Sequence, residues 1–204
     1  EARRGITLTA IYGWKPGATL PVSGINEDDY KMATQIILWE YQQQLRSDPY
    51  NRHGNGHADG DQYFSVIAGR PAEKAYDWIL AQVASHSTVP SFTSSKKSEA
   101  PELELKWDVE KKVYTLTVTD TNNLKIDLEA LKGSGVSVTR NGNEYTFTSR
   151  QMMMDPVLFE FRKNIPVAND MLIWGRPGYQ TMMTGASDPV SFFVKIKTET
   201  YGTA

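Results

Sequence analysis

The hydrophobic pattern of the chain changes from a helical to a strand period near residue 87, and this change limits the folds that the chain can adopt. Between Asn26 and Ser87, apolar residues recur at intervals of three and four, which is typical of the buried face of a helix. Beyond a connector rich in Ser, Thr, Pro and Lys, short runs alternate apolar and polar residues, as strands do. Because 204 residues can form one domain with a substantial core, we expect a helical part and a β-rich part within one unit, residues 1–204.

Two helices are predicted in the first part of the chain. Asn26 can cap the first helix, which has acidic residues in its first turn and should run to about Arg46. Its buried stripe repeats every four residues, at Ala33, Ile37 and Tyr41. The second helix should begin at Pro71 and end near His86, whose ring we expect to interact with the C-terminal carbonyls of that helix.

Strands are predicted on both sides of these helices. The run Ile6–Gly13 is rich in β-branched and aromatic residues and ends near a Pro-Gly turn. Asn141-Gly142, between two alternating runs, predicts a type I′ hairpin. The other candidate strands are short runs bounded by turns or polar residues: 103–107, 113–118, 136–139, 145–148, 158–161, 171–174, 179–183 and 191–197.

These elements predict an α+β fold with a β-sandwich-like core, because many short alternating strands commonly form a sandwich or a barrel. The two helices would form a subdomain inserted after the first strand. In this interpretation, about 26–86 is a helical lobe, and about 1–25 together with about 100–200 is a β-rich lobe.

Charge and hydropathy exclude several classes of partner. The chain has 22 basic and 24 acidic residues and no basic tract interleaved with aromatic residues, so we expect no nucleic-acid partner. Its apolar runs are too short to cross a bilayer, so we expect no membrane insertion of this part of the protein. Since the sequence begins at Glu1 rather than methionine, we expect a processed or excised domain of a longer protein, although cloning explains that start equally well.

One loop carries residues that bind metals in other proteins. His53, His57, Asp59 and Asp61 lie among glycines within a few residues of one another. Their spacing fits neither an EF-hand nor a standard zinc motif, so we expect a solvated loop and no metal site or cofactor. A metal-dependent enzyme built on these four residues is an alternative hypothesis.

Other features of the sequence favour packing or binding over catalysis. With three histidines and no G-x-S-x-G motif, the chain lacks the signature of a serine hydrolase. The Met152–Met154 run is expected to fill gaps in the core. Aromatic residues near turns allow a second alternative, a noncovalent carbohydrate- or peptide-binding β-sandwich whose groove would use Trp14, Trp174 and Tyr179.

Three segments together resemble the thioester domains of Gram-positive surface adhesins and pilus-tip proteins. The run YGWKPG, residues 12–17, is similar to the family's aromatic-Cys-apolar motif followed by a Pro-Gly turn. The run TQIILW, residues 34–39, is similar to the Thr-Gln-x-x-apolar-Trp helix motif. The run YQTMM, residues 179–183, is similar to the apolar-Gln segment near the domain's end.

The resemblance implies a cysteine–glutamine site from which the cysteine is missing. In the family, the cysteine sulfur displaces ammonia from a glutamine side chain, and a lysine amine on the host surface then opens the thioester. The chain contains no cysteine, and Gly13 occupies that position, with Gln180 as the partner glutamine. The remaining motif residues would brace the site or contact the target: Tyr12, Trp14, Thr34, Gln35, Trp39 and Tyr179. Among them, we expect Gln35 and Trp39 to pack as the scaffold of the site.

The implied function is attachment to a host cell surface or extracellular-matrix protein, without enzymatic turnover. The protein would be a monomeric, extracellular domain of a larger surface protein whose cell-wall anchor lies outside this sequence. Either natural loss or engineered replacement explains Gly13, although engineered replacements are usually alanine or serine. An isopeptide bond between Lys15 and Gln180 is a further alternative, which would need a buried catalytic acid and an unprotonated lysine.

Overall fold

The computed structural model describes residues 2–45, 62–128, 134–165, 172–174, 182–184 and 187–200, with the backbone alone for residues 2, 172–174 and 182–184. The chain divides into two units. The first consists of residues 1–86 and 166–188, and the second of residues 87–165 and 189–204.

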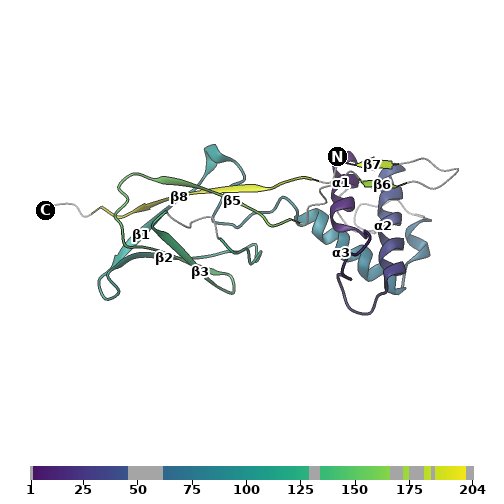
Figure 1. Cartoon of the computed structure of the whole chain (residues 1–204), viewed down its shortest axis with the longest axis horizontal. Coiled ribbons are helices and arrows are strands. Elements are labelled where there is room, and N and C mark those ends of the chain that lie inside the picture. Colours follow the sequence, from purple (N-terminus) through teal and green to yellow (C-terminus); the bar gives the residue numbers. More distant parts are fainter. Residues whose placement is uncertain are drawn as a thin grey trace. The chain divides into compact units, whose positions relative to one another are not determined.

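The first unit contains three α-helices that contact one another: α1, Ala2–Tyr12; α2, Glu27–Gln42; and α3, Pro71–Ser85 (Figure 1). A short 3-10 helix, η1, spans Phe64–Val66. The two predicted helices are confirmed as α2 and α3. Asn26 caps α2 through a capping box, in which its side chain and that of Asp29 each accept a hydrogen bond from the other's backbone N–H.

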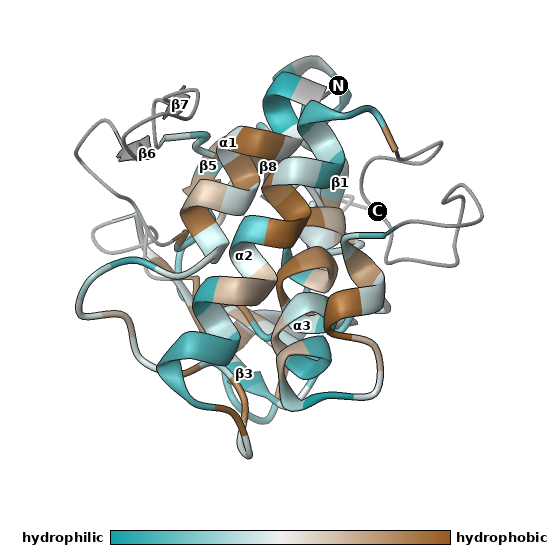
Figure 2. Ribbon diagram, turned by 90° about the vertical axis from the view of Figure 1, so that its right-hand side faces the viewer, coloured by the Kyte–Doolittle hydropathy of each residue, from teal (hydrophilic) through white to brown (hydrophobic). Residues whose placement is uncertain are grey.

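Apolar residues of α2 and α3 lie on the faces where the helices pack, and polar residues lie on the opposite faces, as the alternating colours along each helix show (Figure 2). Among the helices that the structure describes, none combines the length and the apolar character of a membrane span.

The predicted opening strand is wrong, because residues 2–12 form helix α1. The β-branched residues that suggested a strand are accommodated by local bonds and by packing. The Thr7 and Thr9 hydroxyls donate to the carbonyls of Arg3 and Gly5, one turn earlier, at 3.1 and 2.7 Å. Leu8 and Ile11 are buried in the helical unit, so tertiary burial outweighs a weak strand propensity.

The first unit also contains a two-stranded antiparallel hairpin. Its strands are β6, Leu172–Trp174, and β7, Met182–Thr184, and they pair in register from Leu172 with Thr184 to Trp174 with Met182. The backbone of β7 contacts α1. The strands predicted at 171–174 and 179–183 overlap β6 and β7, and the rest of the predicted ranges, 171 and 179–181, lies outside the described residues.

The second unit is a single six-stranded sheet that curls into a half-barrel. The spatial order is β3-β4-β2-β1-β8-β5, and only the pairing of β1 with β8 is parallel. The strands are β1, Glu102–Asp108; β2, Val113–Thr119; β3, Val136–Asn141; β4, Glu144–Ser149; β5, Val157–Arg162; and β8, Ser191–Thr198. A short 3-10 helix, η2, spans Lys97–Glu99 and precedes β1.

The predicted β-sandwich with an inserted two-helix subdomain is wrong, although the chain is α+β. Three helices precede one mixed sheet, and α1 occupies the position of the predicted first strand. Alternation of apolar and polar residues shows only that one face of each strand is buried. A curled sheet buries its concave face as effectively as two stacked sheets bury their inner faces, so the pattern does not distinguish them.

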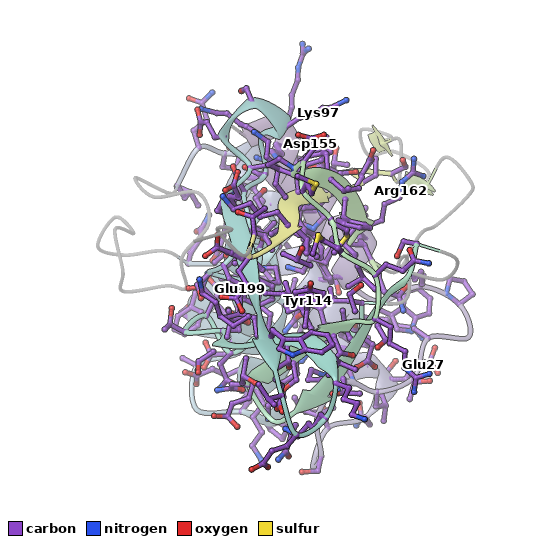
Figure 3. The ribbon with its side chains drawn as sticks, turned by 90° about the vertical axis from the view of Figure 1, so that its left-hand side faces the viewer. Glu27, Lys97, Tyr114, Asp155, Arg162 and Glu199 are labelled. Atoms are coloured by element: carbon purple, nitrogen blue, oxygen red, sulfur yellow. The ribbon has the colours of Figure 1, made fainter. Side chains whose placement is uncertain are left out.

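The core of the sheet is largely aromatic. Tyr114, Phe147 and Phe192 are buried in it, and Tyr114 is labelled among the strands in Figure 3.

Two carboxylates accept hydrogen bonds from the backbone of this unit. Just after β8, Glu199 accepts a hydrogen bond from the backbone N–H of Trp107 at 2.5 Å. The buried carboxylate of Asp120 accepts hydrogen bonds from three backbone N–H groups, those of Ser91, Asn122 and Leu124. These bonds fix the loop that follows β2.

Two local predictions in this unit need correction. The β3–β4 hairpin forms, but its central residues are Gly142 and Asn143, and of the two only Gly142 has a positive φ, of 59°. A type I′ turn requires positive φ at both positions, so the turn is not of that type. Of the three methionines expected in the core, only Met153 packs there, while Met152 and Met154 are 52% and 68% exposed.

The packing of α1 on α2 depends on a glycine. A Cβ atom at Gly5 would lie 2.3 Å from the ring of Tyr41, which is buried. Overpacking of this kind costs about 1–3 kcal/mol, against a gain of about 1 kcal/mol from the helix propensity of alanine.

We expect Gly5→Ala to lower the free energy of unfolding, measured with denaturant. Arg3→Ala, on the exposed face of α1, is the control and should change it by less than about 0.5 kcal/mol. Equal stability of the two variants would contradict this packing.

Candidate functional site

The segment that follows α1 is held against α2 by two side chains of that helix, those of Tyr30 and Thr34. The Tyr30 hydroxyl donates to the backbone carbonyl of Tyr12 at 2.5 Å. The Thr34 hydroxyl accepts a hydrogen bond from the backbone N–H of Trp14 at 2.8 Å and donates to the carbonyl of Tyr30, also at 2.8 Å. Both side chains are buried, and burial raises the pKa of Tyr30 to about 12, so its phenol remains a donor at neutral pH. The backbone on either side of Gly13 is therefore fixed.

Gly13 lies at the centre of this segment and has no room for a side chain. Its N–H donates to the carbonyl of Thr9 at 2.6 Å, which continues the last turn of α1. A Cβ atom at Gly13 would lie 2.5 Å from both the Thr34 methyl carbon and the Thr9 carbonyl oxygen. Only a shift of both groups would admit a larger residue, so this backbone is specific for glycine.

Two lysines flank the segment. The ammonium group of Lys31, on α2, lies 4.6 Å from the centre of the Trp14 ring, in a cation–π contact. Lys15 donates from Nζ to the carbonyl of Ile11 at 3.1 Å, and burial lowers its pKa. Half-buried Trp14 and Lys15 thus extend the site from Gly13 toward the surface.

The motif residues on α2 divide between the core and the surface. Thr34 is fully buried and Gln35 is half-buried. The prediction that Trp39 packs in the core is wrong, because its side chain is 41% exposed and rests against Tyr63, with 5.4 Å between ring centres. Trp39 lies five residues after Thr34, half a helical turn away from the buried stripe. Its side chain therefore lies at the surface beside Tyr63 and does not support the core.

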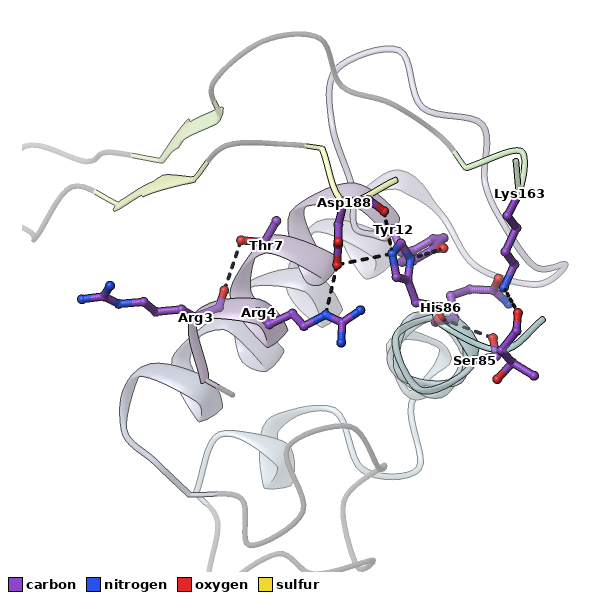
Figure 4. Close-up of polar contacts among 10 residues, drawn as sticks. Arg3, Arg4, Thr7, Tyr12, Ser85, His86, Lys163 and Asp188 are labelled. Carbon is purple, nitrogen blue, oxygen red and sulfur yellow. Dashed lines mark hydrogen bonds and ion pairs between the residues drawn. The ribbon is translucent and has the colours of Figure 1, made fainter. Parts of the chain in front are cut away.

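His86 ends α3, but its ring makes long-range contacts instead of the predicted contacts with the carbonyls of its own helix. Nδ1 lies 2.8 Å from the Tyr12 hydroxyl, and Nε2 lies 2.8 Å from the backbone carbonyl oxygen of Asp188 (Figure 4). The Asp188 carboxylate pairs with Nε of Arg4 at 3.0 Å. Burial, and then the charge of Asp188, raises the pKa of Tyr12. Tyr12, the predicted neighbour of the missing cysteine, is therefore held through its side chain as well as its backbone.

Several predicted site residues lie outside the described residues, namely Gln180, Tyr179 and the four candidate metal ligands His53, His57, Asp59 and Asp61. Trp174 is described by its backbone in β6, so of the three rings proposed for a binding groove only that of Trp14 is described. Within the part of the chain that is described, no group of three His, Cys, Asp or Glu side chains could hold a metal ion.

Sequence reasoning missed Tyr30, Arg4 and Asp188. The first could have been found, since Tyr30 lies four residues before Thr34 and shares its face of α2. The bonds from His86 to Tyr12 and Asp188 span 74 and 102 residues. No local pattern predicts contacts of that range.

The Thr34 hydroxyl gives a direct test of how the segment is held. Thr34→Val removes the acceptor for the Trp14 N–H, a part-buried donor, which should cost about 1–3 kcal/mol of stability. Thr34→Ser keeps the hydroxyl and is the control. We expect the valine variant to unfold at lower denaturant concentration than the serine variant, with faster hydrogen exchange at the Trp14 amide. A valine variant at least as stable as the serine variant would show that the hydroxyl is dispensable.

Comparison with known proteins agrees with the motif and the fold. The thioester domain family model matches residues 1–85, which include Gly13 and the 34–39 motif. Among solved structures, the chain is similar to the thioester domain of the Staphylococcus aureus TIE protein, with 17% sequence identity and a TM-score of 0.52, over 97% of this chain and 70% of the other. No curated protein matches significantly. The predicted resemblance is confirmed: residues 1–85 match the thioester domain family model, and the chain as a whole is similar in fold to a thioester domain.

Proposed function

We propose that this protein is an adhesion domain of a bacterial surface protein that binds its target without forming a thioester. The observation that carries the proposal is a thioester-domain match over residues 1–85 in a chain that contains no cysteine. A thioester needs sulfur, which attacks the glutamine amide and later leaves when an amine attacks. Gly13 can do neither, so attachment would rest on noncovalent contacts.

The proposed partner of Gly13 is Gln180. In this proposal its side chain remains a carboxamide that can donate and accept hydrogen bonds. The strand β7 begins two residues after Gln180 and contacts α1, the helix that ends just before Gly13. This backbone contact between the two segments supports the proposed pairing.

The packing around Gly13 favours natural loss of the cysteine over engineered replacement. Removal of a side chain from a formed site leaves a space behind it. Here the Thr34 methyl group and the Thr9 carbonyl fill the space where a Cβ atom would lie. We infer that the helices α1 and α2 approach each other in a way that suits glycine.

The proposed target is a host cell-surface or extracellular-matrix protein. Half-buried Trp14, Lys31 beside it and exposed Trp39 offer aromatic and cationic contacts on the helical unit. We propose a monomeric, extracellular domain of a longer cell-wall-anchored protein, with no enzymatic turnover. Family relationship, rather than any feature of the site, supports this location.

Restoring the cysteine tests the proposed Gly13–Gln180 pair. A side chain at Gly13 meets both the Thr34 methyl group and the Thr9 carbonyl oxygen, so the variant should combine Gly13→Cys with Thr34→Ser, which removes the methyl group and keeps the hydroxyl. The last turn of α1 must still shift to clear the Thr9 carbonyl. If Gln180 is adjacent, the purified variant loses one ammonia from its intact mass and reacts with methylamine.

Two controls make this result specific. Gly13→Ser with Thr34→Ser carries a side chain of similar size without a thiol, and should keep its full mass. Adding Gln180→Ala to the cysteine variant should restore the full mass and leave a free thiol. A folded cysteine variant that keeps its ammonia and titrates as a free thiol would refute the assignment of Gly13 and Gln180.

A further inference from the structure

A buried histidine joins the two chain segments that would carry the proposed site. His86 is 1% exposed and lies at the end of α3. Its ring bonds Tyr12, the residue before Gly13, on one side and Asp188, eight residues after Gln180, on the other (Figure 4). The function proposed above for Gly13 and Gln180 gives His86 no role.

The two bonds define the hydrogen-bond roles of the ring. A backbone carbonyl only accepts, so Nε2 of His86 carries a hydrogen and donates to Asp188. In the neutral ring Nδ1 is then an acceptor, and the Tyr12 hydroxyl donates to it. The Tyr12 ring also meets the imidazole edge to face, with 5.7 Å between ring centres and an angle of 75°. His86 therefore fixes both the position and the orientation of Tyr12.

On one side, this restraint reaches Gly13. Tyr12 is held through its hydroxyl by His86 and through its carbonyl by Tyr30. The next two N–H groups are also bonded, that of Gly13 to Thr9 and that of Trp14 to Thr34. Consecutive residues held in this way leave the backbone at Gly13 little freedom.

On the other side, the restraint reaches the segment that returns from the β6–β7 hairpin. Asp188 is bonded by His86 at its carbonyl and by Arg4 at its carboxylate. Nε2 of His86 also lies 3.4 Å from the same carboxylate oxygen that Arg4 contacts. Arg4 and Tyr12 both belong to α1, so Asp188 is tied to that helix directly and again through His86.

We propose that His86 is a positioning residue that sets the Gly13 segment and the Asp188 end of the Gln180 segment in a fixed relation to each other. This inference rests on the proposed function for the pairing of Gly13 with Gln180. It adds that the arrangement does not depend on a covalent bond, because the Tyr12–His86–Asp188–Arg4 network holds it in a chain without cysteine.

Hydrogen exchange on the native chain tests the proposal. His86→Leu removes both ring bonds, so exchange at the Gly13 and Trp14 amides should become about tenfold faster relative to amides inside α2, the change expected for loss of one such bond. Tyr12→Phe removes one hydroxyl and should have the same local effect. His86→Gln retains one donor and one acceptor and should restore slow exchange at both amides.

Tyr76→Phe is the matched control. It removes buried hydrogen bonds from the Tyr76 hydroxyl to Glu40, between α3 and α2, at 2.8 and 3.0 Å. It should leave exchange at Gly13 and Trp14 unchanged relative to α2. Equal acceleration in Tyr76→Phe and His86→Leu would show that His86 only stabilises the helical unit and would overturn the proposal. The same holds if ¹⁵N NMR of the imidazole finds the hydrogen on Nδ1 rather than Nε2 in the neutral ring.

A second readout links the network to the site. In the Gly13→Cys, Thr34→Ser background, adding His86→Leu should slow ammonia loss, and adding His86→Gln should largely restore its rate. If that background loses no ammonia at all, the pairing of Gly13 with Gln180 fails. The exchange measurements on the native chain still decide whether His86 positions Tyr12, so the two failures are distinguishable.

Discussion

The hydroxyl of Thr34 is the interaction on which the geometry around Gly13 depends. One oxygen accepts from the Trp14 N–H and donates to the Tyr30 carbonyl, and thereby joins α2 to the segment that follows α1. Its methyl carbon lies where a side chain of residue 13 would begin. A single threonine thus satisfies a part-buried backbone donor and excludes a larger residue beside it. The threonine of the helix motif has a structural task that persists when the cysteine is absent.

This arrangement separates two properties that a thioester domain normally combines. One is a reactive bond, which needs sulfur, and the other is a fixed surface that brings a partner to that bond. In the proposed function, this chain, which contains no cysteine, has only the second. Hydrogen bonds made by the side chains of Tyr30, Thr34 and His86 hold the backbone around Gly13 in place. A preorganised surface of this kind can bind noncovalently, because the entropic cost of ordering it is met on folding.

The sequence predicts the local elements better than their assembly. The cap at Asn26 and the repeat through Tyr41 define α2 closely, because capping and amphipathic periodicity act over a few residues. The alternating runs predict most strands for the same reason. The interpretation of 6–13 as a strand fails because burial of Leu8 and Ile11 against the helices outweighs local propensity. The choice of one curled sheet over a sandwich depends on pairings such as β1 with β8, which no local pattern specifies.

The candidate site follows the same division. The motif residues Gly13 and Thr34 could be recognised from short segments of sequence, and the structure brings them into contact. The exposure of Trp39 and the bonds of His86 to Tyr12 and Asp188 depend on how distant segments meet. These contacts also hold the segment around Gly13, so the sequence motifs alone point to that segment and overlook what holds it.

We propose that this chain keeps the architecture of a thioester domain without its internal bond. The intact mass of the native protein, measured before and after incubation with methylamine, tests this proposal. We expect a mass equal to that of the sequence and no change on exposure to the amine. A mass lower by one ammonia would contradict it, since it would reveal an internal crosslink, such as an amide between Lys15 and Gln180.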